Sequence, residues 1–487
     1  MPDSPAKPTS VPPEQSAGLT ARLGLYTATM IVIGSMVGSG IFKKPALMAA
    51  QLGSSTLLVL VWLVAGLVTC FGALANAEVA GMITAVGGQY VFFRRIYNDF
   101  VGFLYGWAIF AVIQTGSIAS ISYVFAEYVG YFVKLPHLSP ELESIKVSLF
   151  GIITITPLAD LGTKLCTVAC VLLLTAVNIM GVAFGGAIQN IFTTLKMVAI
   201  AGVVLACFSL GGNASSSDVV AVASSAGGAP LHAGLGLVGA MVAALSGAFW
   251  AYDGWNNITY VAGEVREPSR NIPRALFLGT AAVAALYILV NLAYLRVLPL
   301  SRMASSSLVA ADAMRAVLGH AGGALISALV IFSTFGTTNG TILASARVHF
   351  AMARDGLFFK SLGVVHPRFQ TPARSLLWQG LWASALVFSG TFDQLTDMLI
   401  FVSWIFYLAG AVGVFVLRQR EPHTPRPYRV WGYPVVPAIF VLFAAAYVVI
   451  TPLQSLESFR NAVLGLLLVG LGVPLYLRWR GRAGRAS

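Results

Sequence analysis

A single stretch interrupts the first long apolar run of the chain, residues 23–52: Ile33-Gly34-Ser35-Met36-Val37-Gly38-Ser39-Gly40-Ile41-Phe42. The run is long enough to cross a bilayer, which takes about 20 helical residues. Its middle nevertheless holds three glycines and two serines within seven positions. Glycine costs about 1 kcal/mol in a helix interior relative to alanine, so the helix is predicted to unwind here. Unwound backbone at membrane depth must be buried in protein or line a wet cavity. The alternative is close packing of two helices through small residues.

The composition of the whole chain is that of a polytopic membrane protein. Of the 487 residues, 57% are hydrophobic and only 10% are charged, and the mean hydropathy is +0.82. Soluble domains have about 25% charged residues, so a soluble enzyme is excluded. The net charge of +12 does not indicate a nucleic-acid partner, because basic residues gather in the cytoplasmic loops of membrane proteins. The chain lacks the G-x-x-x-x-G-K-[ST] loop of an ATP-driven pump.

The four cysteines all lie in apolar runs or at their ends. Cys166 and Cys170 are one helical turn apart, but a structural zinc site needs four ligands and no histidine or further cysteine is near them. We therefore expect small buried cysteines, no metal and no cofactor.

Apolar spans follow one another along the chain, and we expect twelve. They are predicted at residues 23–52, 56–83, 99–133, 165–183, 187–210, 235–262, 274–298, 321–350, 376–391, 396–417, 432–452 and 460–478. The segments between spans lie alternately on the two sides of the membrane. The side that includes both termini holds 20 of the 30 Lys and Arg residues. Because positive residues are retained on the cytoplasmic side, both termini are predicted to be cytoplasmic. Residues 1–21 are expected to form a disordered cytoplasmic tail, and residues 211–234 an external flexible linker.

The sixth span contains a second interruption, at Ser246-Gly247-Ala248-Phe249-Trp250-Ala251-Tyr252-Asp253-Gly254-Trp255-Asn256-Asn257. An acidic residue at this depth is costly unless it faces the bundle interior or water, so Asp253 is not expected to face lipid. Spans one to five and spans six to ten form two blocks of nearly equal length, residues 22–210 and 235–418. Five is an odd number, so the second block enters the membrane from the opposite side. This arrangement predicts an inverted repeat with a substrate site between two broken helices. Residues 419–487 add two helices and a basic tail.

A pair of broken helices offers free backbone groups to a zwitterion. The half-helix that begins near Ser39 presents unpaired N–H groups and a positive dipole end, which suit a carboxylate. The last turn before each break presents free carbonyls, which suit an ammonium group. An α-amino acid carries both charges on adjacent atoms, so it is the expected substrate.

Several motifs resemble the amino acid–polyamine–organocation (APC) superfamily, and within it the L-type amino acid transporter (LAT) branch. Gly38-Ser39-Gly40-Ile41-Phe42 is similar to its first-helix motif, and the run from Phe249 to Asn256 with the following Gly-Glu…Pro…Asn-Ile-Pro-Arg is similar to its sixth helix and loop. The run Ser345-Ala346-Arg347…Asp355-Gly356-Leu357-Phe358 resembles the end of its eighth helix. The resemblance covers most of residues 22–418. It implies an all-α fold of twelve transmembrane helices of the leucine-transporter type, a 5+5 inverted repeat with helices 1 and 6 broken.

The resemblance also implies roles for residues at the two breaks. Ser39 and Gly40 would donate hydrogen bonds to the substrate carboxylate, so added bulk there is expected to fill the carboxylate pocket. The carbonyls of Ser35 or Met36, and of Trp250 and Asp253, would receive the amine. Trp250 would be an aromatic gate, although ordinary aromatic packing is the alternative for it. The implied substrate-binding residues are Ser35, Met36, Gly38, Ser39, Gly40, Trp250, Ala251, Tyr252, Asp253 and Gly254.

The chain departs from the family pattern in two places. Eukaryotic light chains carry a cysteine in the external loop after the third span that links them to a heavy subunit, and residues 134–163 contain none. We therefore expect no disulfide-linked heavy subunit and a prokaryote-like transporter of the bacterial inner membrane. Asp253 stands where relatives often have a small residue, so its role is left open.

Lys196 lies in the middle of the fifth span, where insertion of a lysine costs about +2.5 to +3.5 kcal/mol. It is too far from either end to reach the interface, so it is predicted to face the bundle interior. The resemblance implies that its ammonium group occupies the place of a cation bound by sodium-coupled relatives, donating to carbonyls around Gly34 and Ser35. Transport is then predicted to be independent of sodium, with Lys196 as a fixed tether or as a proton carrier.

The function predicted from these observations is exchange of neutral L-amino acids by alternating access. Proton-coupled uptake and a carrier for cationic amino acids or polyamines are the alternatives, and Asp253 is the obvious acidic residue for the second of them. A channel would need a pore-lining filter, for which no motif is found. A sensor on a transporter fold is a further alternative.

Overall fold

The computed structural model describes residues 23–149, 153–181, 186–212 and 236–483, and these are almost entirely helical. The α-helices are α1 (Leu25–Met36), α2 (Gly40–Leu52), α3 (Ser55–Met82), α4 (Gln89–Ile96), α5 (Asp99–Ala108), α6 (Gln114–Val129), α7 (Pro140–Glu143), α8 (Leu161–Ile179), α9 (Gly186–Ser209), α11 (Gly236–Tyr252), α12 (Pro268–Val297), α13 (Leu300–Ala304), α14 (Val309–Arg354), α15 (Ala373–Val387), α16 (Phe392–Arg420), α17 (Val435–Ile450), α18 (Leu456–Gly470) and α19 (Gly472–Ala483). A π-helical turn, η1 (Ile109–Ile113), joins α5 to α6, and the 3-10 helices are η2 (Trp255–Glu264), η3 (Lys360–Gly363) and η4 (Thr451–Leu453).

The all-α prediction is confirmed apart from one small hairpin that the sequence did not indicate. Strands β1 (Val147–Leu149) and β2 (Ile153–Ile155) pair antiparallel between α7 and α8, with Ser148 opposite Thr154. The predicted tail 1–21 and most of the predicted linker 211–234 lie outside the described residues.

Eleven helical segments of the described chain are long and apolar enough to cross a membrane, one fewer than the twelve predicted. The missing one corresponds to the expected span 376–391, where α15 has 15 residues. At 1.5 Å per residue such a helix is about 22 Å long, less than the roughly 30 Å of a hydrocarbon core. Five of the eleven segments combine two or more elements, at Leu25–Leu52, Asp99–Val129, Gly236–Glu264, Val435–Leu453 and Leu456–Trp479.

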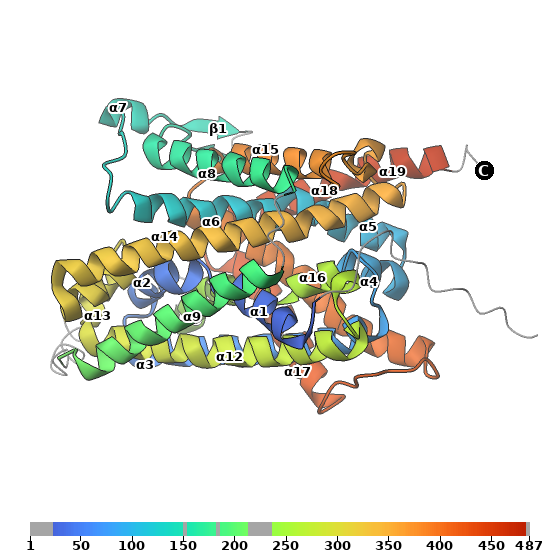
Figure 1. Cartoon of the computed structure of the whole chain (residues 1–487), viewed down its shortest axis with the longest axis horizontal. Coiled ribbons are helices and arrows are strands. Elements are labelled where there is room, and N and C mark those ends of the chain that lie inside the picture. Colours follow the sequence, from blue (N-terminus) through green and yellow to red (C-terminus); the bar gives the residue numbers. More distant parts are fainter. Residues whose placement is uncertain (1–22, 150–152, 182–185, 213–235, 484–487) are drawn as a thin grey trace, which may run out of the picture.

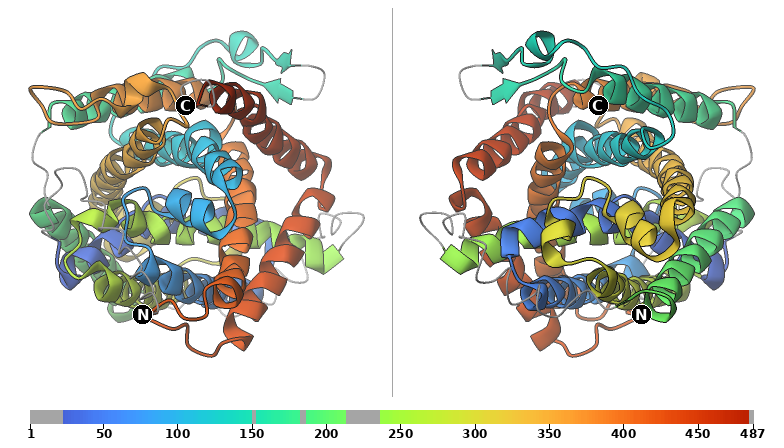
Figure 2. Two further views of the ribbon diagram at one scale, coloured as in Figure 1. Left: turned by 90° about the vertical axis from the view of Figure 1, so that its right-hand side faces the viewer. Right: turned by 90° about the vertical axis from the view of Figure 1, so that its left-hand side faces the viewer.

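The long helices run side by side along the long axis of the molecule (Figure 1). We call the end that carries α4 and α19 the terminal end, and the opposite end, with α7 and α13, the distal end. Views from these two ends place α8, α9 and the C-terminal helices at the periphery (Figure 2). The basic residues predict that the terminal end faces the cytoplasm.

Both interruptions found in the sequence are breaks in helical structure. Helix α1 ends at Met36 and α2 begins at Gly40, and between them Val37 leaves the helical region with ψ of 89°. Helix α11 ends at Tyr252, and Gly254, with φ of +93°, precedes the 3-10 helix η2. Glycine adopts this left-handed conformation without strain, and a Cβ at this position would lie 2.9 Å from the carbonyl oxygen of Ser35. The two breaks therefore lie against each other.

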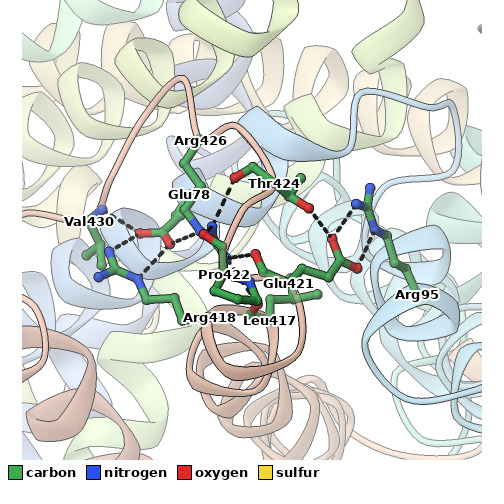
Figure 3. A network of polar contacts seen from close by, with 9 residues as sticks. All are labelled: Glu78, Arg95, Leu417, Arg418, Glu421, Pro422, Thr424, Arg426 and Val430. Atoms are coloured by element: carbon green, nitrogen blue, oxygen red, sulfur yellow. Dashed lines mark hydrogen bonds and ion pairs between the residues drawn. The ribbon is translucent and has the colours of Figure 1, made fainter. Parts of the chain in front are cut away.

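A network of ion pairs and hydrogen bonds links Glu78 and Arg95 to residues 417–430 (Figure 3). The buried Glu78 carboxylate accepts two hydrogen bonds from Arg418, at 2.9 and 2.7 Å, and one from the backbone N–H of Val430 at 2.7 Å. Arg426 forms a further ion pair with it at 3.3 Å. Beside it, Arg95 donates to Glu421 at 3.1 and 2.6 Å, which holds the pKa of this carboxyl below its ordinary value. The network ties α3 to the end of α16 and to the loop that follows it.

Candidate functional site

A cavity of about 340 Å³ lies between the two breaks. Its lining comes from α1 and α2, α6, α11 and η2, and α14, and consists of Ser35, Met36, Gly38, Ser39, Gly40, Gln114, Ser117, Ile121, Trp250, Asp253, Gly254, Asn257, Thr337 and Thr341. Eight of the ten substrate-binding residues expected from the sequence belong to this lining.

Hydrogen-bond donors gather on the cavity wall near the start of α2. The first N–H groups of a helix have no partner within the helix. The Phe42 N–H already donates to the Ser39 oxygen at 3.2 Å, which leaves those of Gly40 and Ile41 for a ligand. The Ser39 hydroxyl is buried and has no hydrogen-bond partner among the described residues, and the same holds for the Ser117 hydroxyl and the Trp250 indole N–H. A buried polar group without a partner is costly, so these three groups favour a polar ligand.

The carbonyls expected to receive an amine differ in how free they are. The Tyr287 hydroxyl lies 2.8 Å from the Met36 oxygen and 3.1 Å from the Ala251 oxygen, and its single hydrogen is shared between these two acceptors. The Trp250 oxygen accepts from the backbone N–H of Asp253 at 3.2 Å. Because a carbonyl oxygen has two lone pairs, Met36 and Trp250 retain capacity for one further bond.

Ala251 and Tyr252 do not line this cavity, although they were expected in the site. Ala251 packs where α11 crosses α2, since a Cβ on Gly40 would lie 2.3 Å from its Cα. Tyr252 points away, and its hydroxyl donates to the Trp62 carbonyl at 3.2 Å. Consecutive residues of a helix point in different directions, so one break cannot present all of its residues to one cavity.

Asp253 lies between this cavity and a second one of about 230 Å³. The second cavity is mostly aromatic and is lined by Thr69, Phe249, Tyr252, Asp253, Trp255, Trp404, Tyr407 and Phe440. The Tyr407 hydroxyl donates to the Asp253 carboxylate at 2.6 Å. Asp253 is therefore held by a side chain of α16. Among the residues that line these two cavities, Asp253 is the one acidic residue.

Lys196 of α9 lies behind the break in α1 and does not line the cavity. It is 2% exposed, and its ammonium group donates to the Val37 oxygen at 2.8 Å, to the Thr337 hydroxyl at 2.9 Å and to the Gly34 oxygen at 3.1 Å. An ammonium group has three N–H donors, and all three are used here. The Val37 carbonyl takes the place expected for Ser35, because Val37 lies beyond the last helical turn and, with ψ of 89°, its carbonyl does not follow the helix axis.

Six lining residues were not anticipated from the sequence, and most of them are polar residues of α6 and α14. Gln114 donates to the Asn257 side chain at 3.1 Å, and Thr337 connects the cavity to Lys196. The run Gln114-Thr115-Gly116-Ser117 in an otherwise apolar span was a signal that could have identified the α6 residues. It follows directly after η1, and single π-helical turns are frequent at functional sites.

No group of three or more His, Cys, Asp or Glu residues that could hold a metal ion occurs in the described part of the chain. Of the cysteines, Cys170 and Cys207 are buried, whereas Cys70 and Cys166 are partly exposed.

Comparison with known proteins places the chain among transporters. Residues 23–471 match the family model described as amino acid permease. The chain is 30% identical over 443 residues to the human b(0,+)-type amino acid transporter 1, a match that covers 91% of this chain and 84% of the relative. It is 31% identical over 469 residues to the serine/threonine exchanger SteT of Bacillus subtilis, covering 96% and 98%. It is 32% identical over 478 residues to the large neutral amino acids transporter small subunit 2 of Oryctolagus cuniculus, covering 95% and 82%.

Proposed function

Because the chain belongs to the amino acid permease family, we propose that it exchanges neutral L-amino acids across a membrane by alternating access, without sodium. The observation that carries this proposal is the cavity between two helix breaks, whose lining includes Ser35 and Met36 at the end of α1 and Ser39 and Gly40 at the start of α2. The relatives named above are transporters and exchangers rather than enzymes.

In this proposal the cavity grips the part that all α-amino acids share. The substrate carboxylate would accept from the Ser39 hydroxyl and from the N–H groups at the start of α2, and the ammonium group would donate to the Ser35 and Met36 carbonyls. Trp250 would cover the bound substrate. The side chain would extend toward Asp253 and the aromatic second cavity, which favours an apolar side chain.

The proposed architecture is the 5+5 inverted repeat. The first block would comprise α1 with α2, α3, α5 with α6, α8 and α9, and the second α11 with η2, α12, α14, α15 and α16. Helix α15 would be the ninth span despite its length, which brings the number of spans to twelve. Helix α17, and α18 with α19, would be the two additional spans. Each block then crosses the membrane five times, as inversion requires.

Lys196 supports independence from sodium. Its ammonium group already bonds the carbonyls that a cation between α1 and α9 would need. Uptake into proteoliposomes should therefore be unchanged when sodium is replaced by choline. Loss of uptake under that exchange would refute the proposal. Lys196→Met should reduce uptake, and wild-type uptake by this variant at every pH would leave the lysine without a role in transport.

A carrier for cationic amino acids is the second candidate, and the position of Asp253 favours it. Its carboxylate lines both cavities and lies among aromatic rings that also attract cations. A panel of labelled amino acids, with and without amino acid preloaded inside the vesicles, separates the possibilities. Neutral substrates that need preloading support neutral exchange. Uptake without preloading that follows a proton gradient would indicate proton coupling instead.

The remaining expectations are part of the same proposal. Both termini would be cytoplasmic, and the protein would reside in a bacterial inner membrane. The loop of residues 134–163 contains no cysteine, so a disulfide-linked heavy subunit is not expected there. Non-reducing electrophoresis of the protein from its native membrane would show a slower, reducible band if such a partner existed.

A further inference from the structure

Lys44 is a charged residue buried in the wall between α2 and α16. Its side chain is 1% exposed, and its ammonium group donates to the Asp393 carboxylate at 2.7 Å and to the Thr396 hydroxyl at 2.8 Å. Asp393 and Thr396 both belong to the first turns of α16. The transport site described above does not use this contact.

The contact is connected to the cavity through aromatic rings. The Lys44 ammonium lies 4.8 Å from the centroid of the Phe392 ring, a distance at which a cation and a ring attract each other. Phe392 in turn packs edge-on against Trp250, with ring centroids 6.1 Å apart and an interplanar angle of 82°. Trp250 lines the cavity. Lys44, Phe392 and Trp250 therefore form a continuous chain of contacts from the cavity outward.

This chain of contacts lies on the distal side of the break. Lys44 is one helical turn beyond Gly40, and α2 packs against α13, which marks the distal end (Figure 1). The stem of Lys44 also lies beside α11, because a Cβ on Gly247 would be 3.4 Å from its Cδ. One side chain thus contacts the second half of the first broken helix, the first half of the other and the start of α16.

We propose that Lys44, Asp393 and Phe392 form a latch that closes the cavity toward the distal end. The proposal rests on the proposed function, in which the cavity opens alternately to the two sides. In the closed arrangement Lys44 is a positioning residue that holds Phe392 over Trp250. When the latch opens, α2 separates from α16 and the cavity becomes accessible from the distal end.

The exposure of the two partners suits a contact that forms and breaks in each transport cycle. Lys44 is buried, but the Asp393 side chain is 46% exposed. Water reaches the Asp393 carboxylate on its exposed side, so water can replace Lys44 as its partner when the contact breaks. The neighbouring pair, Lys43 and Glu127 at 2.6 Å, joins α2 to α6 instead. The latch can therefore be removed while this second link between α2 and the bundle is kept.

Thiol accessibility tests the latch without reference to transport. The four native cysteines are replaced by alanine, and Ser117→Cys places a reporter on the cavity wall. The protein is inserted into vesicles, its orientation is determined with a C-terminal tag, and a membrane-impermeant methanethiosulfonate reagent is added from each side. Lys44→Met and Asp393→Asn should each raise the rate of labelling from the distal side by up to about fivefold, the factor that corresponds to about 1 kcal/mol.

The matched control is Asp312→Asn, which removes an ion pair between Asp312 and Arg315 within one helix at the same end. Asp312 also accepts a hydrogen bond from the Ser306 hydroxyl at 2.6 Å, which an asparagine oxygen can still accept. Neither contact involves α2 or α16, so this variant should leave the labelling rates unchanged. Wild-type distal labelling in both latch variants, with normal elution on size-exclusion chromatography, would overturn the proposal. If Lys44→Met fails to fold, Asp393→Asn decides alone, because its side chain is half-exposed. Substrate is absent, so failure of the proposed function would not alter this result.

Discussion

Replacing Gly40 by alanine adds one methyl group at the point where α2 crosses α11. An ideal Cβ at this position would lie 2.3 Å from the Cα, 2.5 Å from the Cβ and 3.0 Å from the backbone nitrogen of Ala251. Carbon atoms in contact are normally about 3.5 to 4.0 Å apart. The overlap is with backbone, so no flexible side chain can turn away. The two helices must therefore separate by more than about 1 Å, measured against that contact distance.

The expected loss can be worked out from this overlap. Overpacking a well-packed contact costs about 1–3 kcal/mol. If that cost falls on the arrangement in which both breaks line the cavity, its population decreases about 5- to 150-fold. The initial rate of amino acid exchange in proteoliposomes, normalised to folded protein, should decrease by that factor for Gly40→Ala. From the sequence, added bulk at Gly40 is expected to fill the carboxylate pocket, whereas the structure directs the new methyl group at α11.

Two other glycines provide a graded comparison. Gly202 in α9 has nothing within 4 Å of an ideal Cβ, so Gly202→Ala should exchange at the wild-type rate. At Gly38 the nearest atom is the Thr337 Cγ2 at 3.1 Å, which is a side-chain atom, so Gly38→Ala should lose less than Gly40→Ala. Wild-type exchange by Gly40→Ala, with unchanged elution on size-exclusion chromatography, would refute the close crossing of α2 and α11 and with it the geometry of the site.

Three further outcomes are expected. Trp250→Ala should reduce transport more than substrate binding if Trp250 is a gate, and equal losses of uptake and of equilibrium binding would indicate simple contact. Cysteines at Ser216, which lies outside the described residues, and at Gln370 should be labelled from opposite sides of the membrane; labelling from one side would contradict the span order. Glu78→Gln leaves two arginines without their carboxylate and should lower the free energy of unfolding by about 3 kcal/mol or more in a thermal melt. Glu267→Gln, at an exposed pair, should change it by less than about 1 kcal/mol, and equal shifts would be inconsistent with a buried network.

The two helix breaks could be predicted from the sequence because they depend on local composition. Glycine clusters are where a helix most readily unwinds, and Asp253 marks a segment that cannot face lipid. Both breaks lie within a few residues of the predicted positions. Lys196, in the middle of an apolar span, likewise implied an interior partner, because a lysine that faces lipid at this depth costs several kcal/mol.

Contributions from other helices could not be predicted in the same way. Gln114, Ser117 and Thr337 line the cavity because α6 and α14 pack against the breaks in one particular register. For α6 that register follows a π-helical turn, which rotates every later side chain relative to a regular helix. Val37 rather than Ser35 bonds Lys196 for a similar reason, since the direction of a carbonyl depends on where the last helical turn ends.

The contacts of Lys196 connect the two roles left open for it. As an ammonium group it donates three hydrogen bonds, two of them to the carbonyls of Gly34 and Val37 at the end of α1. A neutral amine has only two N–H groups, so deprotonation would leave one of the three acceptors without this donor. An unsatisfied buried acceptor costs about 1–3 kcal/mol, which is enough to change the balance between two conformations of the break.

A proton carrier at this position would therefore loosen the tether each time it released its proton. A fixed tether would keep all three bonds, and the rate of exchange would then not depend on the protonation of Lys196. Uptake by the wild type and by Lys196→Met, compared across pH, distinguishes these cases, because only a proton carrier gives a pH dependence that the variant loses.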